Sequence, residues 1–280
     1  MRRLLLGDRR LVMGVVNVTP NSFSDGGLYF TASKATAQAL RLLDEGADIV
    51  DLGGESTRPG ASQGVVSEAE EVQRVIPVIE AVKKARPDAY VSIDTYKSAV
   101  ARAAVQAGAE IVNDVSGFLW DEKMLATLSE MQCGAVLMHM RGRPAEWRSL
   151  PPIGDAVGLV KRELAERAAG AVAASVTKDR LVLDPGFGFG KSFDENYPLL
   201  AGFANLHELG FPLLAGVSRK SFIGRTLSND GKDAAVTDRL HGTLAAETAL
   251  VLAGAHIIRT HDVRACVDAM RIADAIRQVG

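Results

Sequence analysis

The stretch EGADIV at residues 45–50 occurs almost unchanged at two other places in the chain. It returns as AGAEIV at 107–112 and as AGAHII at 253–258. A helix-like pattern precedes each copy, and an apolar run begins inside it. Glycine readily adopts the left-handed backbone conformation that ends many helices, so each copy predicts a tight joint from a helix to a strand. Three such joints indicate a chain that alternates helices with strands.

The same alternation extends from one end of the chain to the other. Short runs rich in Val, Ile and Leu predict strands near 11–18, 48–53, 90–94, 110–115, 134–140, 180–184, 211–217 and 255–260. Amphipathic stretches between them predict helices near 31–45, 67–86, 97–107, 122–132, 155–176, 192–209, 237–253 and 264–278. Continuous apolarity in the strands is typical of parallel strands buried on both faces. Ser67 and Glu70 resemble a capping box at the start of the second helix.

Eight strand–helix units predict an α/β fold, the (βα)8 TIM barrel, which typically needs about 250 residues. An open doubly wound sheet is the alternative that the pattern leaves open. Because no linker or shift in composition divides the 280 residues, we expect 1–280 to form a single domain. In such a barrel the tight joints lie on the N-terminal face. The longer polar loops lie on the C-terminal face, where barrel enzymes carry their active sites.

Composition argues against several classes of protein. The formal net charge of -2 does not fit a general nucleic-acid binder, whose surface is basic. No segment approaches the roughly 20 apolar residues of a membrane span, and the apolar run at 4–6 is too short for a signal peptide. Cys133 and Cys266 are too few and too widely spaced for a disulfide framework or a metal site. We therefore expect a soluble, cytoplasmic protein.

Polar residues stand where the predicted strands end. Asp94, Asn113 and Asp184 should point into the mouth of the barrel. Carboxylate and carboxamide groups together can meet the edge of a flat heterocycle that carries amino, N–H and carbonyl groups. This set predicts a site for such a ring.

Cationic residues follow the last two predicted strands. Lys220, Arg259 and His261 stand at the usual phosphate-binding corner of this barrel, where an oxygen-rich anion is the natural partner. Simpler interpretations exist for all the strand-end residues. Asp94 could cap the following helix, Asp184 could be a turn residue, Lys220 and Arg259 could be surface charges, and His261 could be structural. Their common location on one predicted face favours a functional site.

The run GFGFGKS at 186–192 looks like a nucleotide-binding P-loop. That motif requires a glycine five places before the glycine that precedes the lysine, and Pro185 occupies this place. No His, Glu or Cys grouping has the spacing of catalytic zinc, and no serine stands in a nucleophile elbow. The sequence thus gives no support for these three chemistries.

Four segments carry a resemblance to a known family: NVTPNSFSDG at 17–26, GGESTRPG at 53–60, DPGFGFGK at 184–191 and SRKSF at 218–222. Through them, and over nearly its whole length, the chain closely resembles the dihydropteroate synthases. These transferases of folate biosynthesis join 6-hydroxymethyl-7,8-dihydropterin diphosphate to 4-aminobenzoate and release diphosphate. The resemblance implies this activity, a pterin-binding barrel, a homodimer, and sulfonamides as competitors of 4-aminobenzoate.

The resemblance also implies roles for residues at matching positions. The pterin would contact Asp94, Asn113, Met138, Asp184 and Lys220. The diphosphate would contact Asn17, Thr57, Arg259 and His261, with Asn17 also a ligand of Mg²⁺. The 4-aminobenzoate pocket would contain Phe23, Asp25, Arg58, Pro59, Phe189 and Ser218. The residues expected to act in catalysis are Asp184, Lys220, Arg259 and His261.

A mechanism follows from these implied roles. Mg²⁺, Arg259 and His261 would neutralise the departing diphosphate. An anionic Asp184 would stabilise the methylene cation left on the pterin. The aniline nitrogen is unprotonated at neutral pH, so its attack needs no strong general base. Lids formed by the loops after the first two strands would exclude water.

Two other functions stay open at this stage. A pterin-dependent methyltransferase domain would share the barrel and the pterin pocket, but it would not need Arg58, Pro59 or the run at 218–220. A non-catalytic pterin-binding barrel would have no obvious use for Asn17 or Arg259. The loop at 141–148 departs from the family pattern beyond Pro144, which leaves its construction open.

Overall fold

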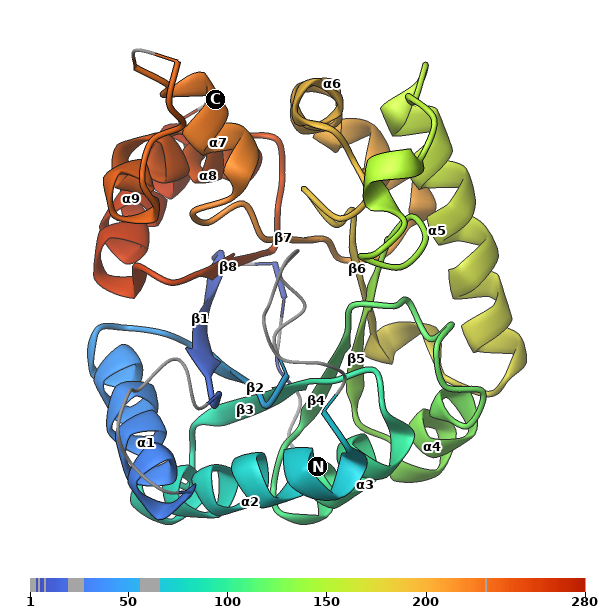
Figure 1. The fold of residues 1–280 in the computed structure, drawn as a ribbon, viewed down its shortest axis with the longest axis vertical. Helices are drawn as coiled ribbons and strands as arrows, with labels where there is room; N and C mark the ends of the chain where they lie inside the picture. Colours follow the sequence, from blue (N-terminus) through green and yellow to red (C-terminus); the bar gives the residue numbers. More distant parts are fainter. Residues whose placement is uncertain are drawn as a thin grey trace.

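The computed structural model describes residues 4, 6, 7, 9–19, 28–55, 66–229 and 231–279, and it is a barrel of parallel strands surrounded by helices (Figure 1). The strands are β1 (Leu11–Asn17), β2 (Ile49–Gly53), β3 (Tyr90–Asp94), β4 (Ile111–Asp114), β5 (Gly134–Met138), β6 (Leu181–Asp184), β7 (Leu214–Ala215) and β8 (Ile257–Thr260). The α-helices are α1 (Leu28–Asp44), α2 (Glu68–Ala85), α3 (Ser98–Gln106), α4 (Met124–Met131), α5 (Ala156–Ala173), α6 (Phe193–Ala201), α7 (Ser221–Thr226), α8 (Leu240–Leu252) and α9 (Val263–Arg277). Short 3-10 helices are η2 (Trp147–Ser149), η3 (Lys178–Arg180), η4 (Phe203–Leu209) and η5 (Val236–Arg239).

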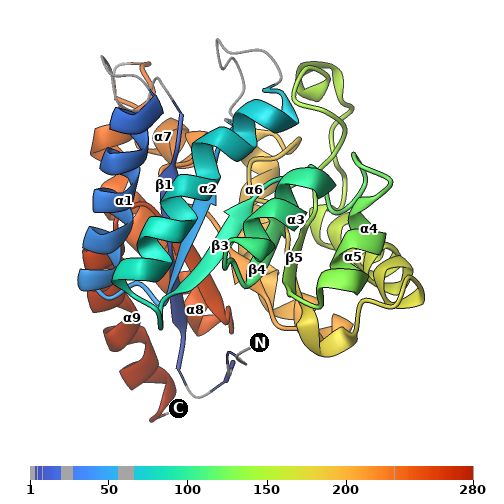
Figure 2. The same ribbon diagram turned by 90° about the horizontal axis from the view of Figure 1, so that it is seen from below.

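All strand pairs are parallel, and the strand order is β6-β5-β4-β3-β2-β1-β8-β7. A parallel bridge between Leu183 and Leu213 joins β6 to the chain just before β7, and the N–H of Leu183 donates to the Pro212 carbonyl over 2.9 Å. This contact brings the two ends of the sheet together. The (βα)8 barrel is therefore confirmed over an open sheet. Seen from the side, both chain ends lie opposite the loops that follow the strands (Figure 2).

The three repeated joints adopt the predicted structure. Gly46, Gly108 and Gly254 have φ values of 106°, 116° and 99°. At each joint, the alanine after the glycine donates its N–H to the carbonyl five residues earlier over 2.9 Å, as in a Schellman motif. The end of α5 has the same pattern of bonds around Ser175, whose φ is 70°. No glycine marks that joint, so the sequence pattern did not show it.

Two predicted local features are only partly right. The helix predicted over 192–209 divides into α6 and η4 at Gly202, where a side chain would lie 2.6 Å from Cγ2 of Val157 in α5. Close packing against α5 thus requires glycine, which is also a weak helix former. At the start of α2, the Ser67 hydroxyl accepts the Glu70 N–H over 3.2 Å. The Glu70 carboxylate pairs with Arg74 instead of completing a capping box.

The barrel interior has an apolar layer below and a polar layer above. The lower layer contains Leu11, Met13, Ile49, Val136, Leu214 and Ile257. Because side chains alternate along a strand, the residue two places further on points the same way. Asp51 follows Ile49 in this manner, and Arg259 follows Ile257. A cavity of about 650 Å³ opens at the N-terminal face beside Leu4, Leu6 and Met13, and its lining contains none of the predicted site residues.

Within the described ranges, none of the helices combines the length and the apolarity needed to cross a membrane.

The carboxyl group of Glu247 in α8 is buried beside Thr260 of β8 and Cys266 of α9. Burial raises the pKa of this carboxyl to about 7, although Thr260 and Cys266 beside it favour the ionised form. The unfolded chain would ionise Glu247 near pH 4.5. The native state therefore binds the extra proton between these two values, and native stability decreases as pH rises from about 4.5 to about 7.

Glu247→Gln removes this ionisation and should make the protein more stable than the wild type at pH 8. The gain at pH 8 should be on the order of 3 kcal/mol, since one pKa unit corresponds to about 1.4 kcal/mol, and it should shrink at pH 5. Urea unfolding at the two pH values measures the effect. The exposed Glu80→Gln variant is the control and should show no pH-dependent gain. Equal gains for Glu247→Gln at both pH values would show that its effect does not come from ionisation.

Candidate active site

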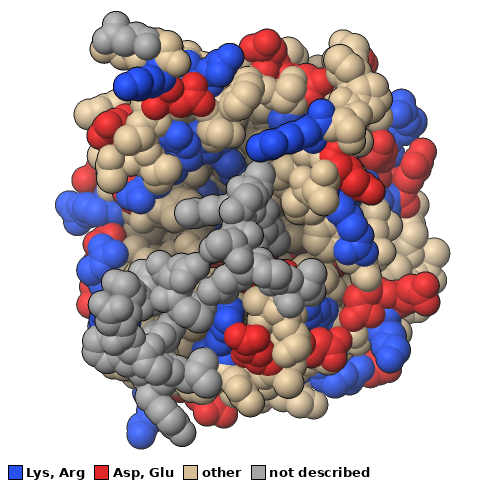
Figure 3. Space-filling view, in the orientation of Figure 1, with Lys and Arg blue, Asp and Glu red and all other residues tan. Residues whose placement is uncertain are grey.

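Arg259 of β8 lies at the centre of the polar layer and joins two other strands. Its Nε donates to Oδ2 of Asp51 in β2 over 2.6 Å, and its Nη2 donates to Oδ2 of Asp94 in β3 over 2.6 Å. Burial alone would lower the pKa of Arg259, but the two carboxylates outweigh it and raise that pKa. Arg259 is thus a fixed cation. Figure 3 shows basic side chains (blue) bordering the centre of this face.

Two buried acceptor atoms beside Arg259 point to a ligand that donates hydrogen bonds. The Asn113 Nδ2 donates to Oδ2 of Asp51 over 3.1 Å, which fixes the orientation of the carboxamide. Among the described residues, neither Oδ1 of Asp51 nor Oδ1 of Asn113 has a hydrogen-bond partner, although both atoms are buried. Buried polar atoms in proteins are nearly always paired. Amino or ring N–H groups of a bound molecule would satisfy both of these acceptors.

Asp184 ends β6 directly beside Met138, its partner in the β5–β6 register. Its Oδ1 accepts the N–H of Gly186 over 2.7 Å, so the turn interpretation holds for one carboxylate oxygen. Gly186 has a φ of 64°, and a side chain there would collide with the His139 carbonyl. Burial raises the pKa of Asp184, while the Gly186 N–H and the charges of Lys220 and Arg259 oppose this increase. The carboxylate therefore belongs to both the turn and the charged site.

The glycine-rich loop after β6 is held from inside by Lys191. Its buried ammonium donates to the carbonyls of Gly186 and Phe189 over 2.8 and 3.3 Å. Burial lowers the pKa of Lys191 to about 7. The lysine of the P-loop-like run thus serves the fold of its own loop. The same loop places the Phe189 ring against Lys220, whose Nζ lies 3.8 Å from the ring centroid.

Ser218 and His261 connect the loops after β7 and β8. The Ser218 Oγ accepts the backbone N–H of His261 over 3.1 Å and lies 3.0 Å from its Nδ1. Ser218 is buried. Its hydroxyl therefore orients the imidazole of His261, a contact that the sequence did not predict.

Asn17 ends β1, where it is paired in register with Gly53 of β2. Its side chain is half-buried and makes no hydrogen bond to another residue in the described part of the chain. The carboxamide oxygen is therefore a possible ligand at the rim of the mouth.

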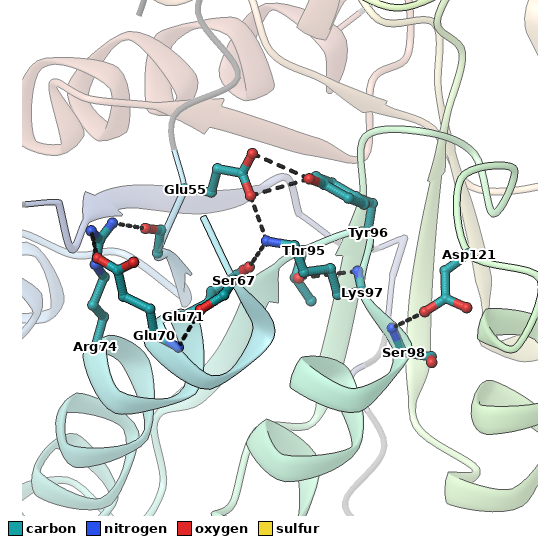
Figure 4. A network of polar contacts seen from close by, with 11 residues as sticks. Glu55, Ser67, Glu70, Glu71, Arg74, Thr95, Tyr96, Lys97, Ser98 and Asp121 are labelled. Atoms are coloured by element: carbon teal, nitrogen blue, oxygen red, sulfur yellow. Dashed lines mark hydrogen bonds and ion pairs between the residues drawn. The ribbon is translucent and has the colours of Figure 1, made fainter. Parts of the chain in front are cut away.

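A second charged cluster lies just beyond the C-terminal ends of β2 and β3 (Figure 4). The buried ammonium of Lys97 pairs with the carboxylates of Glu55 and Glu71, and the Tyr96 hydroxyl donates to Glu55 over 3.2 Å. Burial would lower the pKa of Lys97, but the two glutamates outweigh it and raise that pKa. The cluster joins the end of β2 to α2 and to the loop after β3. It thus fixes the strand ends that carry Asp51 and Asp94.

Lys97→Met should destabilise the protein by about 3–5 kcal/mol, because the Glu71 carboxylate would remain buried without its counter-ion. Urea unfolding followed by circular dichroism measures this loss. The matched control is Lys161→Met, which removes an exposed ion pair with Glu208. That change should cost less than about 1 kcal/mol. Equal losses in the two variants would contradict a special role for the buried cluster.

Comparison with known proteins identifies the family. The sequence model described as "Pterin binding enzyme" matches residues 13–261. Dihydropteroate synthase of Escherichia coli (strain K12) is 45% identical over 264 residues, which cover 94% of this chain and 90% of that protein. The chain belongs to the dihydropteroate synthase family. This membership confirms the resemblance seen in the four sequence segments.

Solved structures of dihydropteroate synthases have the same fold. The Xanthomonas albilineans enzyme with 4-aminobenzoic acid has a TM-score of 0.88 and 45% identity, covering 96% of this chain and 94% of the other. The Yersinia pestis enzyme in a sulfonamide drug complex has a TM-score of 0.89 and 41% identity, covering 99% and 97%. As a member of this family, the chain is a transferase of folate biosynthesis.

The described part of this dihydropteroate synthase fold brings most of the predicted site residues to one face. Those at or just after the strand ends are Asn17, Asp94, Asn113, Met138, Asp184, Phe189, Ser218, Lys220, Arg259 and His261. Phe23, Asp25, Thr57, Arg58 and Pro59 lie outside the described residues, so their roles stay predictions. Asp51 was missed, although a carboxylate two places after an inward-facing isoleucine was a usable signal.

Proposed function

We propose that this chain joins 6-hydroxymethyl-7,8-dihydropterin diphosphate to 4-aminobenzoate, giving 7,8-dihydropteroate and diphosphate. The observation that carries the proposal is the buried centre in which Arg259 bridges Asp51 and Asp94 beside two acceptor atoms. A flat heterocycle with amino and ring N–H groups matches these acceptors. The activity named for the relatives requires such a ring.

The pterin would lie across the polar layer, with its edge toward Asp94, Asn113 and Asp184. Met138 is buried next to Asp184 and would pack against the ring. Lys220, in the loop after β7, lies over the Phe189 ring and would donate to a ring acceptor. Since Asn113 and Asp184 are buried, a ring without the matching donors would leave their acceptor atoms unpaired. The site should therefore discriminate strongly against analogues that lack the amino group.

The diphosphate would lie toward β8. Arg259 uses Nε and Nη2 for the two carboxylates, so Nη1 is the nitrogen that would meet a phosphate oxygen. His261, oriented by Ser218, would donate to the same group. We further propose that Thr57 contacts the diphosphate, as the family motif implies. The Arg259 cation and these hydrogen-bond donors would stabilise the negative charge that grows on the leaving oxygen.

In the reaction the methylene C–O bond breaks, and its electron pair leaves with the diphosphate. The resulting methylene cation is conjugated with the pterin ring, and the carboxylate of Asp184 would stabilise it electrostatically. The aniline nitrogen then forms the C–N bond and loses one proton to solvent. Phe189 and Ser218, with Phe23, Asp25, Arg58 and Pro59, are proposed to line the pocket for 4-aminobenzoate.

Mg²⁺ fits this site as an ion that arrives with its diphosphate. The carboxamide oxygen of Asn17 is a hard ligand of the kind that Mg²⁺ prefers, and Mg²⁺ commonly takes its other ligands from phosphate and water. In the described part of the chain, no group of three or more His, Cys, Asp or Glu residues could hold a metal alone. When bound, Mg²⁺ would supply charge neutralisation at the leaving diphosphate.

The direct test mixes purified protein with Mg²⁺, the pterin diphosphate and 4-aminobenzoate, and measures dihydropteroate and diphosphate. Well-folded protein that makes no product would overturn the proposal. Pterin binding without turnover would favour a non-catalytic pterin-binding barrel, and methyl transfer from a folate would favour a methyltransferase.

Binding is proposed to be ordered, with the pterin first. Tight 4-aminobenzoate binding to protein without pterin diphosphate or diphosphate would contradict that order.

Sulfonamides should compete with 4-aminobenzoate, because they resemble it.

Residues 1–280 are proposed to form one domain, which is supported by the family match over 13–261. A cytoplasmic location is proposed on the basis of Cys133 and Cys266, which are both buried free thiols.

A homodimer is proposed through α9, where Ile272 and Ile276 expose apolar side chains. Sedimentation of the wild type and of an Ile272→Glu/Ile276→Glu variant tests it, with a smaller mass expected for the variant.

A further inference from the structure

Arg219 has an unfavourable backbone conformation between two residues of the proposed site. It follows Ser218 and precedes Lys220, and its φ is 57°. A residue with a Cβ rarely adopts this left-handed conformation, and such strain persists only where the surroundings impose it. The Lys220 N–H donates to the Val217 carbonyl over 3.1 Å, which closes a turn around Ser218 and Arg219. The conformation of Arg219 therefore sets the directions of both neighbours.

Contacts on every side of Arg219 impose this conformation. Its backbone N–H donates to the hydroxyl of Thr243 over 3.0 Å, and Thr243 is fully buried in α8. Its carbonyl accepts from Nη1 of Arg239 over 3.0 Å. Its guanidinium binds both carboxylate oxygens of Asp262, with Nε 2.8 Å from Oδ2. A two-pronged contact of this kind fixes the angle as well as the distance between the groups.

Asp262 directly follows His261 and occupies the position just before α9, where its side chain makes no capping hydrogen bond to the helix. The loops after β7 and β8 are therefore joined at two successive positions, Ser218 to His261 and Arg219 to Asp262. The side chains of Arg219 and Asp262 are 34% and 19% exposed, so solvent reaches this ion pair and limits its contribution to stability. This pair is therefore better explained by the alignment of the two loops than by stabilisation of the fold.

We propose that Arg219 and Asp262 are positioning residues that lock the loop carrying Lys220 to the loop carrying His261. This inference rests on the proposed function, in which Lys220 meets the pterin and His261 meets the diphosphate. The two groups act on one substrate molecule, so their relative placement decides how well its leaving group is stabilised. An error of about 1 Å in such placement can reduce rates by roughly 100-fold.

The test compares Asp262→Asn, Arg219→Met and Arg219→Gly in the full-length enzyme. Each variant should lose roughly 10- to 100-fold in kcat/KM for the pterin diphosphate, with a melting temperature within about 3 °C of the wild type. Arg219→Gly relieves the strained backbone but also removes the ion pair, so it should lose as much as Arg219→Met. The double variant Arg219→Met/Asp262→Asn should lose little more than either single variant, because the two residues act as one unit.

A matched control is the exposed ion pair of Arg86 and Asp44, in which Nη2 of Arg86 lies 2.7 Å from Oδ1 of Asp44. The two residues lie at the ends of α2 and α1 on the N-terminal face. Asp44→Asn should leave the kinetics unchanged. Binding of inorganic diphosphate, measured by calorimetry, gives a readout that does not need turnover. It should weaken about 10-fold in Asp262→Asn and stay unchanged in Asp44→Asn.

Four outcomes distinguish the alternatives. Wild-type kinetics and diphosphate affinity in Asp262→Asn and Arg219→Met would overturn the inference. A defect in Arg219→Met alone would also overturn it, because Arg219 would then contact the substrate directly. A wild-type enzyme without turnover would instead remove the proposed function, while diphosphate binding would still test the lock. Partial recovery in Arg219→Lys, which keeps the charge but loses the two-pronged contact, would support it.

Discussion

Asp184→Asn is expected to lower kcat/KM for the pterin diphosphate on the order of 100- to 1000-fold, the loss typical of one removed electrostatic stabiliser. Asparagine keeps the size of the side chain and can still accept the Gly186 N–H through its Oδ1. What disappears is the negative charge next to Lys220 and Arg259, which both favour the ionised form of Asp184. The substitution therefore tests charge rather than shape. Steady-state kinetics with calorimetric measurement of pterin binding shows the effect.

The matched control is Asp155→Asn, which changes an exposed N-cap of α5. Asparagine is as good an N-cap as aspartate, so both stability and kinetics should be retained.

Burial raises the pKa of Asp184 to about 6, so activity of the wild type should fall as pH decreases through this value and the carboxylate gains a proton. The residual activity of Asp184→Asn should lack that limb of the profile. Wild-type kinetics in the variant would refute the assigned role.

The parts of the fold that follow from local rules could be predicted from the sequence. The joints at Gly46, Gly108 and Gly254 were predictable because glycine tolerates positive φ values and marks the helix ends in the sequence. The joint at Ser175 uses the same bonds with a residue that gives no such signal. Tertiary packing overrode the pattern at Gly202, where α5 approaches too closely for a side chain.

The candidate site was predictable by position but not by partner. Strand ends of a parallel barrel meet on one face, and this rule alone groups Asp94, Asn113 and Arg259. The contacts of Arg259 with Asp94 and with Asp51 span 165 and 208 residues of sequence. No periodicity shows that these two carboxylates share one guanidinium. Asp51 was overlooked because it lies inside an apolar run and resembles part of a buried strand. The left-handed conformation of Arg219 depends on contacts from α8 and α9, which sequence order does not reveal.

Arg259→Met is expected to reduce turnover by at least about 1000-fold and also to destabilise the protein by about 3–5 kcal/mol. Methionine replaces much of the volume of arginine but supplies no charge. Asp51 is fully buried, so its carboxylate would lose its counter-ion without gaining water. Asp94 would lose the same partner. Urea unfolding and steady-state kinetics together measure the two losses.

Stability and catalysis can be separated with a second substitution. Asp51→Asn added to Arg259→Met neutralises the buried carboxylate and should recover much of the lost stability, because the two side chains are directly coupled. Turnover should stay low, since the cation that faces the diphosphate is still missing. Exposed Arg86→Met is the control and should change neither quantity by much. If the double variant regained turnover, Arg259 would be a structural partner of Asp51 rather than a group that acts on the substrate.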